Sequence, residues 1–157
     1  MTAKPHVLII DAPYYAAICA ELLGGATEAL AMAGATFDRV SVPGVLEIPS
    51  ALSMALEAMS RGGTHYDGFV TLGCVIRGET THYDVVAGES ARAIMDICIA
   101  ECIALGNGIQ TVENEAQAWA RANRTEKNKG GGAAEAALAM IAVRDQLFGT
   151  DDGGVDV

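Results

Sequence analysis

Short apolar runs alternate with longer helical patterns along the chain, and this order restricts its possible folds more than any other feature. The apolar runs predict strands at residues 6–10, 36–42 and 69–72, with a further extended segment within 103–112. The helices predicted between and after them span residues 16–33, 49–60, 82–100, 114–124 and 133–147. Strands that alternate with helices form parallel sheets covered on both faces. We therefore expect an α/β fold with a four-stranded parallel sheet.

Length, charge and hydropathy limit the partners of the chain. By length, residues 1–149 are expected to form one domain, and residues 150–157, which are acidic and contain glycine, a disordered tail. A formal net charge of -10 repels nucleic-acid backbones and anionic lipid. No apolar run reaches the roughly 20 uncharged residues of a membrane span, and the N-terminus lacks the pattern of a secretion signal. We expect a cytoplasmic protein without nucleic-acid or membrane partners.

Cysteine spacing argues against a metal site. The four cysteines form no close Cys-x-x-Cys motif, which fits reduced thiols. Cys98 and Cys102 share a helix face, but no His or Cys pair follows them at the spacing of a zinc site. We therefore expect no bound metal.

The most informative stretch spans residues 72–84, where a predicted strand ends in a polar turn that opens a helix. Gly73 and Gly78 would let the backbone approach a ligand closely. Polar turns also follow Ile10 and Val42, so three such turns fall at the carboxyl ends of predicted strands. Ligands of parallel sheets bind at this edge. The three turns predict a small-molecule site there.

The residues that open the predicted helix add chemistry to this site. Thr81 and Asp84 have the spacing of a capping box. The first amides of the helix point unpaired into the turn and can bind phosphate. The same dipole disfavours the charged form of His82, and a neutral imidazole can act as a base. Such a cap with a nearby histidine is also common in helices that bind nothing, so spacing alone leaves both interpretations open.

Three segments resemble the signatures of lumazine synthases, which catalyse the penultimate step of riboflavin biosynthesis. Residues 72–82 read Leu-Gly-Cys-Val-Ile-Arg-Gly-Glu-Thr-Thr-His, residues 42–49 read Val-Pro-Gly-Val-Leu-Glu-Ile-Pro, and residues 128–130 read Asn-Lys-Gly. Their order and separations also match, so the resemblance covers nearly the whole chain, to about Leu147. It implies a flavodoxin-like three-layer α/β/α fold. It also implies the condensation of 5-amino-6-(D-ribitylamino)uracil with 3,4-dihydroxy-2-butanone 4-phosphate to 6,7-dimethyl-8-ribityllumazine, a transferase reaction that needs no cofactor or metal.

The resemblance further implies roles for individual residues. The aromatic that stacks on the heterocycle corresponds to Tyr14, with Tyr15 as the neighbouring option. The other contacts to ribitylaminouracil correspond to Val45, Leu46, Glu47, Cys74, Val75, Ile76 and Asn107. The phosphate contacts correspond to Glu79, Thr80 and Arg121, while Lys129 lies one layer further from the substrates. We expect His82 to transfer protons, Cys74 to serve packing rather than nucleophilic attack, and Arg77 to be structural.

Two departures from the family pattern concern the aromatic wall of the site and the assembly of subunits. Asn107 stands where the family commonly has phenylalanine, on the strand that a neighbouring subunit contributes to the site, and Asn107-Gly108 looks like a turn. The connection from Arg121 to Lys129 lacks the glycine-containing bend of shell-forming members. The resemblance implies a homopentamer whose sites lie between adjacent subunits. Because the bend lacks glycine, we expect these rings to stay free rather than join into a shell.

Two other functions stay open at this point. A paralogue that binds flavin or lumazine without efficient turnover is compatible with Asn107. A flavodoxin-like electron carrier fits less well, because no Ser/Thr/Gly-rich phosphate loop follows the first strand. The joint presence of Glu47, His82 and Arg121 favours the enzyme.

Overall fold

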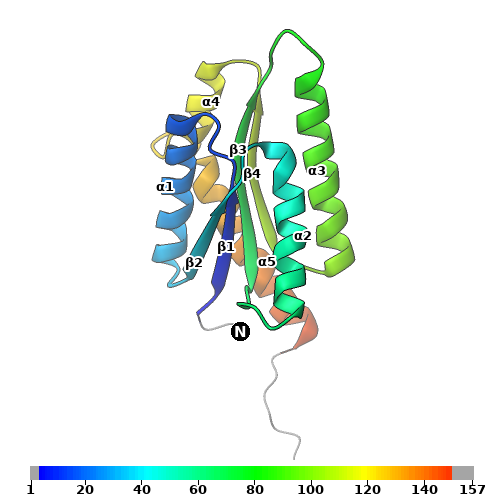
Figure 1. Cartoon of the computed structure of the whole chain (residues 1–157). Coiled ribbons are helices and arrows are strands. Elements are labelled where there is room, and N and C mark those ends of the chain that lie inside the picture. Colours follow the sequence, from blue (N-terminus) through cyan, green and yellow to red (C-terminus); the bar gives the residue numbers. More distant parts are fainter. Residues whose placement is uncertain (1–3, 150–157) are drawn as a thin grey trace, which may run out of the picture.

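The structure, a computed structural model, describes residues 4–149. Its centre is one sheet of four parallel strands, β1 (His6–Asp11), β2 (Thr36–Ser41), β3 (Gly68–Ile76) and β4 (Leu105–Val112). The strand order across the sheet is β2-β1-β3-β4, so β1 and β3 are central and β2 and β4 form the edges. In Figure 1 the carboxyl ends of the strands lie toward the top. The predicted parallel sheet is thus confirmed.

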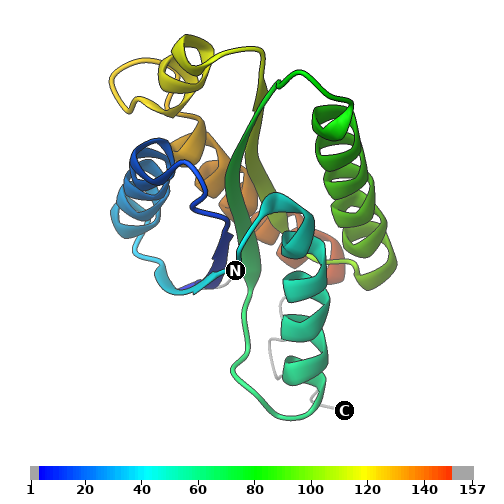
Figure 2. The same cartoon turned by 45° about the horizontal axis from the view of Figure 1, so that its top comes forward.

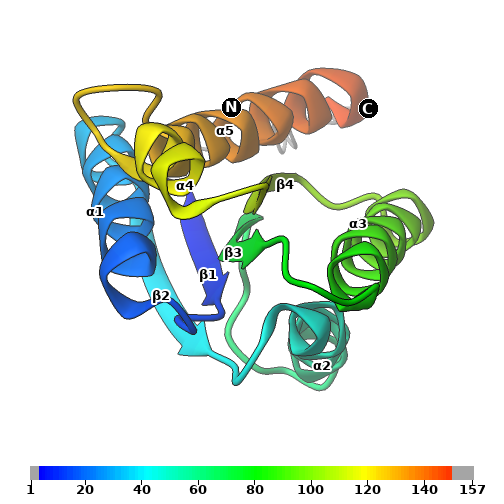
Figure 3. The ribbon, with the colours of Figure 1, turned by 90° about the horizontal axis from the view of Figure 1, so that it is seen from above.

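Helices cover both faces of this sheet. One face carries α1 (Ala16–Met32), α4 (Glu115–Ala122) and α5 (Lys129–Phe148). The other carries a 3₁₀ turn, η1 (Val45–Glu47), followed by α2 (Ile48–Ser60), and then α3 (His82–Glu101). Seen from above, the two groups of helices lie on opposite sides of the strands (Figure 3). This arrangement confirms the predicted three-layer α/β/α fold of flavodoxin-like type.

The central strands alternate between two apolar cores. Val7 and Ile9 of β1 face the α1, α4 and α5 layer, whereas Leu8 and Ile10 face α2 and α3. All four side chains are at most 2% exposed. Burial of such an aliphatic side chain contributes about 1.5–3 kcal/mol, which explains why the central strands read as continuous apolar runs.

Helix α5 packs very closely against both α1 and the sheet. Gly130, in the first turn of α5, lies against the backbone carbonyl of Leu22 in α1, and a Cβ atom on Gly130 would collide with that carbonyl. Gly106 of β4 lies equally close to the carbonyl of Ala133. Small residues at these points let α5 approach both α1 and the sheet.

Three local predictions were wrong. β3 continues to Ile76 rather than ending at Leu72, and Gly73 lies inside the strand, where its missing side chain makes room for Val45 instead of a ligand. Asn107 and Gly108 form part of β4 and not a turn. α5 begins at Lys129 because Asn128 adopts a left-handed conformation (φ 46°) and its Oδ1 accepts a hydrogen bond from the Gly131 amide at 3.2 Å.

Within residues 4–149, no helix combines the length and the apolar character needed to cross a membrane. The disordered tail predicted at residues 150–157 lies outside the described residues.

Candidate active site

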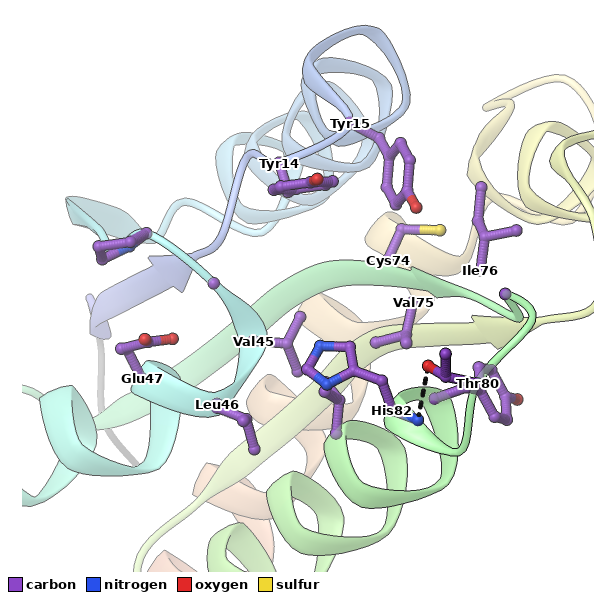
Figure 4. A pocket seen from close by; sticks show the side chains of 15 residues that line it. Tyr14, Tyr15, Val45, Leu46, Glu47, Cys74, Val75, Ile76, Thr80 and His82 are labelled. Atoms are coloured by element: carbon purple, nitrogen blue, oxygen red, sulfur yellow. Dashed lines mark hydrogen bonds between the residues drawn. The ribbon is translucent and has the colours of Figure 1, made fainter.

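A cavity of about 430 Å³ opens at the carboxyl edge of the sheet. It lies beside the ends of β1 and β3, from which the chain crosses to opposite edges of the sheet. This switch point is where open parallel sheets bind ligands. Three connections line the cavity, namely those after β1, after β2 and after β3 (Figure 4). The lining residues are Tyr14, Tyr15, Pro43, Gly44, Val45, Leu46, Glu47, Cys74, Val75, Ile76, Gly78, Thr80, His82, Tyr83 and Val86.

Two aromatic rings from the connection after β1 form one wall. The rings of Tyr14 and Tyr15 stand nearly perpendicular, at 83°, with their centroids 5.1 Å apart. This edge-to-face arrangement stabilises a ring pair beyond its buried area. Tyr15 is half-buried, whereas Tyr14 is 75% exposed, so a flat ligand can cover the Tyr14 ring. Burial, followed by the neighbouring Tyr14 and Cys74, raises the pKa of Tyr15, which keeps its phenol neutral.

The end of β3 supplies an apolar floor. Cys74 and Val75 are buried and Ile76 is half-buried, and all three border the cavity. Burial raises the pKa of Cys74 to about 12, with a smaller contribution from Cys19. The Cys74 thiol therefore stays protonated near neutral pH, which suits packing and disfavours nucleophilic attack.

The connection after β2 carries a carboxylate to the rim. Residues Val45–Glu47 form the 3₁₀ turn η1, and Pro49 follows within the first turn of α2. The Glu47 carboxylate lies over Gly44, where an added Cβ would come within 3.0 Å of Oε2. No hydrogen bond or ion pair joins this carboxylate to another side chain among residues 4–149. Glu47 is thus exposed at the cavity and available to hydrogen-bond donors of a ligand.

The turn between β3 and α3 differs in detail from the sequence prediction. The Thr81 side chain makes no capping hydrogen bond, and the Asp84 carboxylate pairs with Arg77 at 3.5 Å. The predicted capping box is therefore wrong. Instead, Thr80 Oγ1 accepts a hydrogen bond from the His82 amide at 3.3 Å.

The same turn can still hold an anion. Within the described part of the chain, the backbone amides of residues 78–81 donate to no other backbone group. They precede the N-terminus of α3, a helix of 20 residues, whose dipole favours negative charge. Thr80 borders the cavity, whereas Glu79, also predicted for phosphate, is not among the lining residues.

His82 is the first residue of α3 and is exposed to the cavity. Figure 4 shows its imidazole directed away from the helix and toward Val45, across the cavity from the two tyrosines. An imidazole in this position can exchange protons with a ligand held between the tyrosine wall and the turn. Between residues 4 and 149, no group of three or more His, Cys, Asp and Glu side chains is placed to hold a metal ion.

Comparison with known proteins identifies the family. A family model described as 6,7-dimethyl-8-ribityllumazine synthase matches residues 4–145. The chain belongs to this family. It is 59% identical over 145 residues to "6,7-dimethyl-8-ribityllumazine synthase 1" of Rhizobium meliloti strain 1021, covering 92% of this chain and 95% of the relative. It is 55% identical over 147 residues to "6,7-dimethyl-8-ribityllumazine synthase" of Agrobacterium fabrum strain C58, covering 94% and 99%.

The cavity brings together most, but not all, of the residues expected from the lumazine synthase resemblance. Nine of them line it, namely Tyr14, Val45, Leu46, Glu47, Cys74, Val75, Ile76, Thr80 and His82. Asn107 lies within β4, where its Oδ1 accepts hydrogen bonds from Thr71 Oγ1 at 2.9 Å and from the Ile109 amide at 3.0 Å. Arg121 lies on α4, where its Nη1 donates to the Gln117 carbonyl at 3.1 Å. Lys129 opens α5. These three residues do not line the cavity of their own chain.

Four lining residues received no site role from the sequence, namely Pro43, Gly44, Tyr83 and Val86. Val86 follows His82 by one helical turn and therefore lies on the same face of α3. Helical spacing from His82 was the signal that could have found it. Tyr83 lies beside His82, and the Arg77 guanidinium stacks on its ring at 4.3 Å from the centroid. That contact depends on the turn geometry, which the sequence pattern did not reveal.

Proposed function

We propose that the chain catalyses the lumazine synthase reaction. 5-Amino-6-(D-ribitylamino)uracil condenses with 3,4-dihydroxy-2-butanone 4-phosphate to give 6,7-dimethyl-8-ribityllumazine, phosphate and two molecules of water. The observation that carries this proposal is one cavity that combines an aromatic wall, a free carboxylate, an anion-binding turn and an imidazole, in a member of this family. Each of these groups matches a requirement of the reaction.

The heterocyclic substrate fits the side of the cavity formed after β1 and β2. We assign stacking on the pyrimidine ring to Tyr14, whose face is accessible, and hydrogen bonding to polar groups of the ring and ribityl chain to Glu47. The backbone of Val45 and Leu46 and the strand end at residues 74–76 complete this side. Burial of a flat ring here fixes its amine toward the ketone and supplies much of the rate enhancement by proximity.

The phosphorylated ketone fits the turn after β3. The unpaired amides of residues 78–81 and the Thr80 hydroxyl supply hydrogen bonds to its phosphate. We assign the compensating positive charge to Arg121 of an adjacent subunit, with Lys129 behind it. A guanidinium and phosphate form charge-assisted hydrogen bonds, which are stronger than neutral ones.

His82 would move the protons. Imine formation releases one water, phosphate elimination takes a proton from the carbon skeleton, and ring closure takes a proton from the second nitrogen and expels the remaining carbonyl oxygen as a second water. The His82 imidazole beside the phosphate turn can accept and return each of these protons. Electron transfer is not required, since every step is the addition of an amine to a carbonyl, a proton transfer or the loss of a leaving group.

The predicted shared site depends on a neighbouring subunit. Asn107 and Arg121 lie outside the cavity of their own chain, so their predicted roles depend on a head-to-tail contact with a neighbour. We propose that such contacts close into a homopentamer. We also propose that the enzyme works in the cytoplasm, where Cys19, Cys74, Cys98 and Cys102, all free in the structure, stay reduced.

The direct test is to mix the two substrates with the purified protein and follow lumazine fluorescence. Steady formation of the product, well above the uncatalysed reaction, is expected. A protein that forms no product but binds lumazine or riboflavin tightly would overturn the enzyme and favour the binding paralogue. A titration with both ligands, followed through the fluorescence of the single tryptophan, Trp119, would detect this outcome.

A further inference from the structure

Arg77 joins the end of one strand to the first turn of the helix that carries His82. It is the first residue after β3, and its amide donates to the Val112 carbonyl of β4 at 2.9 Å. Its guanidinium Nε pairs with Glu113 Oε2 at 2.9 Å. Nη1 lies 3.5 Å from Asp84 Oδ1, and Cζ lies 4.3 Å from the centroid of the Tyr83 ring. One planar group therefore contacts two consecutive residues of α3 and the residue that follows β4.

The turn between Arg77 and His82 makes few hydrogen bonds to the rest of the fold. Residues 78–81 lie between Arg77 and His82, and their backbone amides make no hydrogen bond with the backbone of the described chain. The Thr80 hydroxyl bonds to the His82 amide within the same turn and so adds no link to the rest of the fold. In Figure 2 this turn spans the gap between the carboxyl end of β3 and α3. The contacts of Arg77 with Tyr83, which lines the cavity, and with Asp84 join the end of β3 directly to the first turn of α3.

The charges around Arg77 argue against a direct role in substrate binding. Two carboxylates, on Glu113 and Asp84, already neutralise its guanidinium, and Arg77 does not line the cavity. An exposed ion pair on its own contributes little to stability, but one cation shared by two carboxylates and a ring forms a network. Such a network favours one geometry of the groups that it joins.

We propose that Arg77 is a positioning residue for catalysis, which acts through His82 by holding the first turn of α3 against the end of β4. This inference rests on the proposed lumazine synthase activity and on the proton-transfer role of His82. The identity of the side chain matters, because lysine cannot stack a planar group on Tyr83 while it pairs with two carboxylates. Loss of these contacts would let the turn and His82 sample other positions, and a small displacement of a reacting group is costly for rate.

A kinetic double-mutant cycle tests the action through His82. We expect Arg77→Gln to lower kcat about tenfold and Arg77→Lys about threefold, within the range for coupled neighbours. His82→Ala should lower kcat by up to about 100-fold. In the His82→Ala background, Arg77→Gln should lower kcat less than twofold, because the group that Arg77 positions is gone. The same tenfold loss in both backgrounds would overturn the inference, as would wild-type kcat in Arg77→Gln.

A matched control lies on the helix that carries His82. Like Arg77, Arg92 of α3 is an exposed arginine with two carboxylate partners, Glu89 at 2.7 Å and Asp96 at 2.9 Å, and it does not line the cavity. Arg92→Gln should leave kcat unchanged. An equal loss of kcat in the Arg77 and Arg92 variants would show a general effect of surface charge and contradict a positioning role.

Amide hydrogen exchange separates this inference from the proposed function, because it needs no activity. Peptides that cover residues 78–86 should exchange faster in Arg77→Gln than in the wild type, and at wild-type rate in Arg92→Gln. Unchanged exchange in Arg77→Gln would overturn the inference even if the enzyme is active. Absence of lumazine formation by the wild-type protein would overturn the proposed function, and with it the catalytic part of this proposal.

Discussion

The carboxylate of Asp11 accepts two hydrogen bonds from the guanidinium of Arg39, from Nη2 at 2.7 Å and from Nε at 3.1 Å. Ser41 Oγ donates to the other carboxylate oxygen at 2.6 Å. Asp11 ends β1 and is 1% exposed, whereas Arg39 and Ser41 belong to the edge strand β2. This network joins the two strands whose ends lead to Tyr14 and Glu47.

We expect Arg39→Ala to lower the free energy of unfolding by about 2 kcal/mol. Breaking a buried ion pair costs roughly 3–5 kcal/mol, and the partial exposure of the Arg39 side chain, 42%, reduces that cost. Arg61→Ala, which removes an exposed pair with Glu57, should cost about 0.5 kcal/mol or less. Urea denaturation at one protein concentration measures both values. Equal losses in the two variants would contradict the prediction that the pair of Arg39 with the buried Asp11 stabilises the fold more than the exposed pair of Arg61 with Glu57.

Two glycines in the first turn of α5 should respond in opposite ways to alanine. Gly130 lies against the Leu22 carbonyl, so Gly130→Ala forces α5 away from α1 and should cost about 3 kcal/mol or more. At Gly132 an added Cβ meets nothing within 4 Å, and Gly132→Ala should stabilise the protein by up to about 1 kcal/mol through helix propensity. Urea denaturation of both variants checks this contrast. Similar changes in both would mean that α1 and α5 are further apart than described.

Much of the fold follows from local patterns, and the differences arise where distant residues compete. The strands and helices could be predicted because the period of the apolar residues reflects which side chains are buried. Burial of these side chains supplies most of the stability of the elements. The end of β3 was misplaced because Gly73 has the composition of a turn, but its role is to accommodate Val45 from another connection. The capping box failed because Arg77 pairs with the Asp84 carboxylate. Neither contact can be read from spacing alone.

The sequence also predicted one part of the candidate site better than the other. The residues predicted on the three connections meet in one cavity because the carboxyl ends of parallel strands share an edge. Asn107, Arg121 and Lys129 do not line that cavity, and their roles stay predictions that depend on a second subunit. A cavity within one chain cannot contain a contribution from its neighbour.

The Cys74 thiol should resist alkylation in the folded protein. Its pKa is raised to about 12 by burial, whereas an unfolded cysteine titrates near about 8.5. At pH 8, iodoacetamide should therefore modify the exposed Cys102 and leave Cys74 intact, and both should react in urea. The raised pKa favours the folded state below about pH 8.5, and this contribution is lost as the pH rises toward 12. Mass spectrometry of digested protein measures the labelling, and equal rates at the two thiols would contradict the prediction.

Arg121→Ala should raise KM for the phosphorylated ketone by roughly 10- to 100-fold, since a charge-assisted contact with phosphate contributes about 1.5–3 kcal/mol. KM for the ribitylaminouracil should change much less. Initial rates with each substrate varied in turn measure the two constants, with Arg61→Ala as a surface control. Equal effects on both constants would mean that Arg121 only supports α4.

Assembly is the last prediction, and it follows from exposed edges and from the position of Arg121. All six residues of the edge strand β2 are exposed, including Phe37 and Val40, and an uncovered strand edge is a surface that another chain can cover. The connection before α5 is held against α1 by Arg124, which pairs with Glu21 at 3.1 Å and Glu28 at 3.4 Å. Residues 122–128 of this connection also contain no glycine, and we expect rings of about five chains that do not join into shells.

Light scattering and subunit mixing test this assembly together. A mass near five chains agrees with the prediction, a mass near about sixty contradicts the inference from the connection, and an active monomer contradicts shared sites. His82→Ala and Arg121→Ala subunits, unfolded and refolded as an equal mixture and assayed at a ketone concentration well below KM, should regain about one quarter of wild-type activity. Half of the sites would keep His82, and half of those would face a neighbour that keeps Arg121. If both residues instead served one chain, every site in the mixture would lack one of them, and activity would stay at the level of the separate variants.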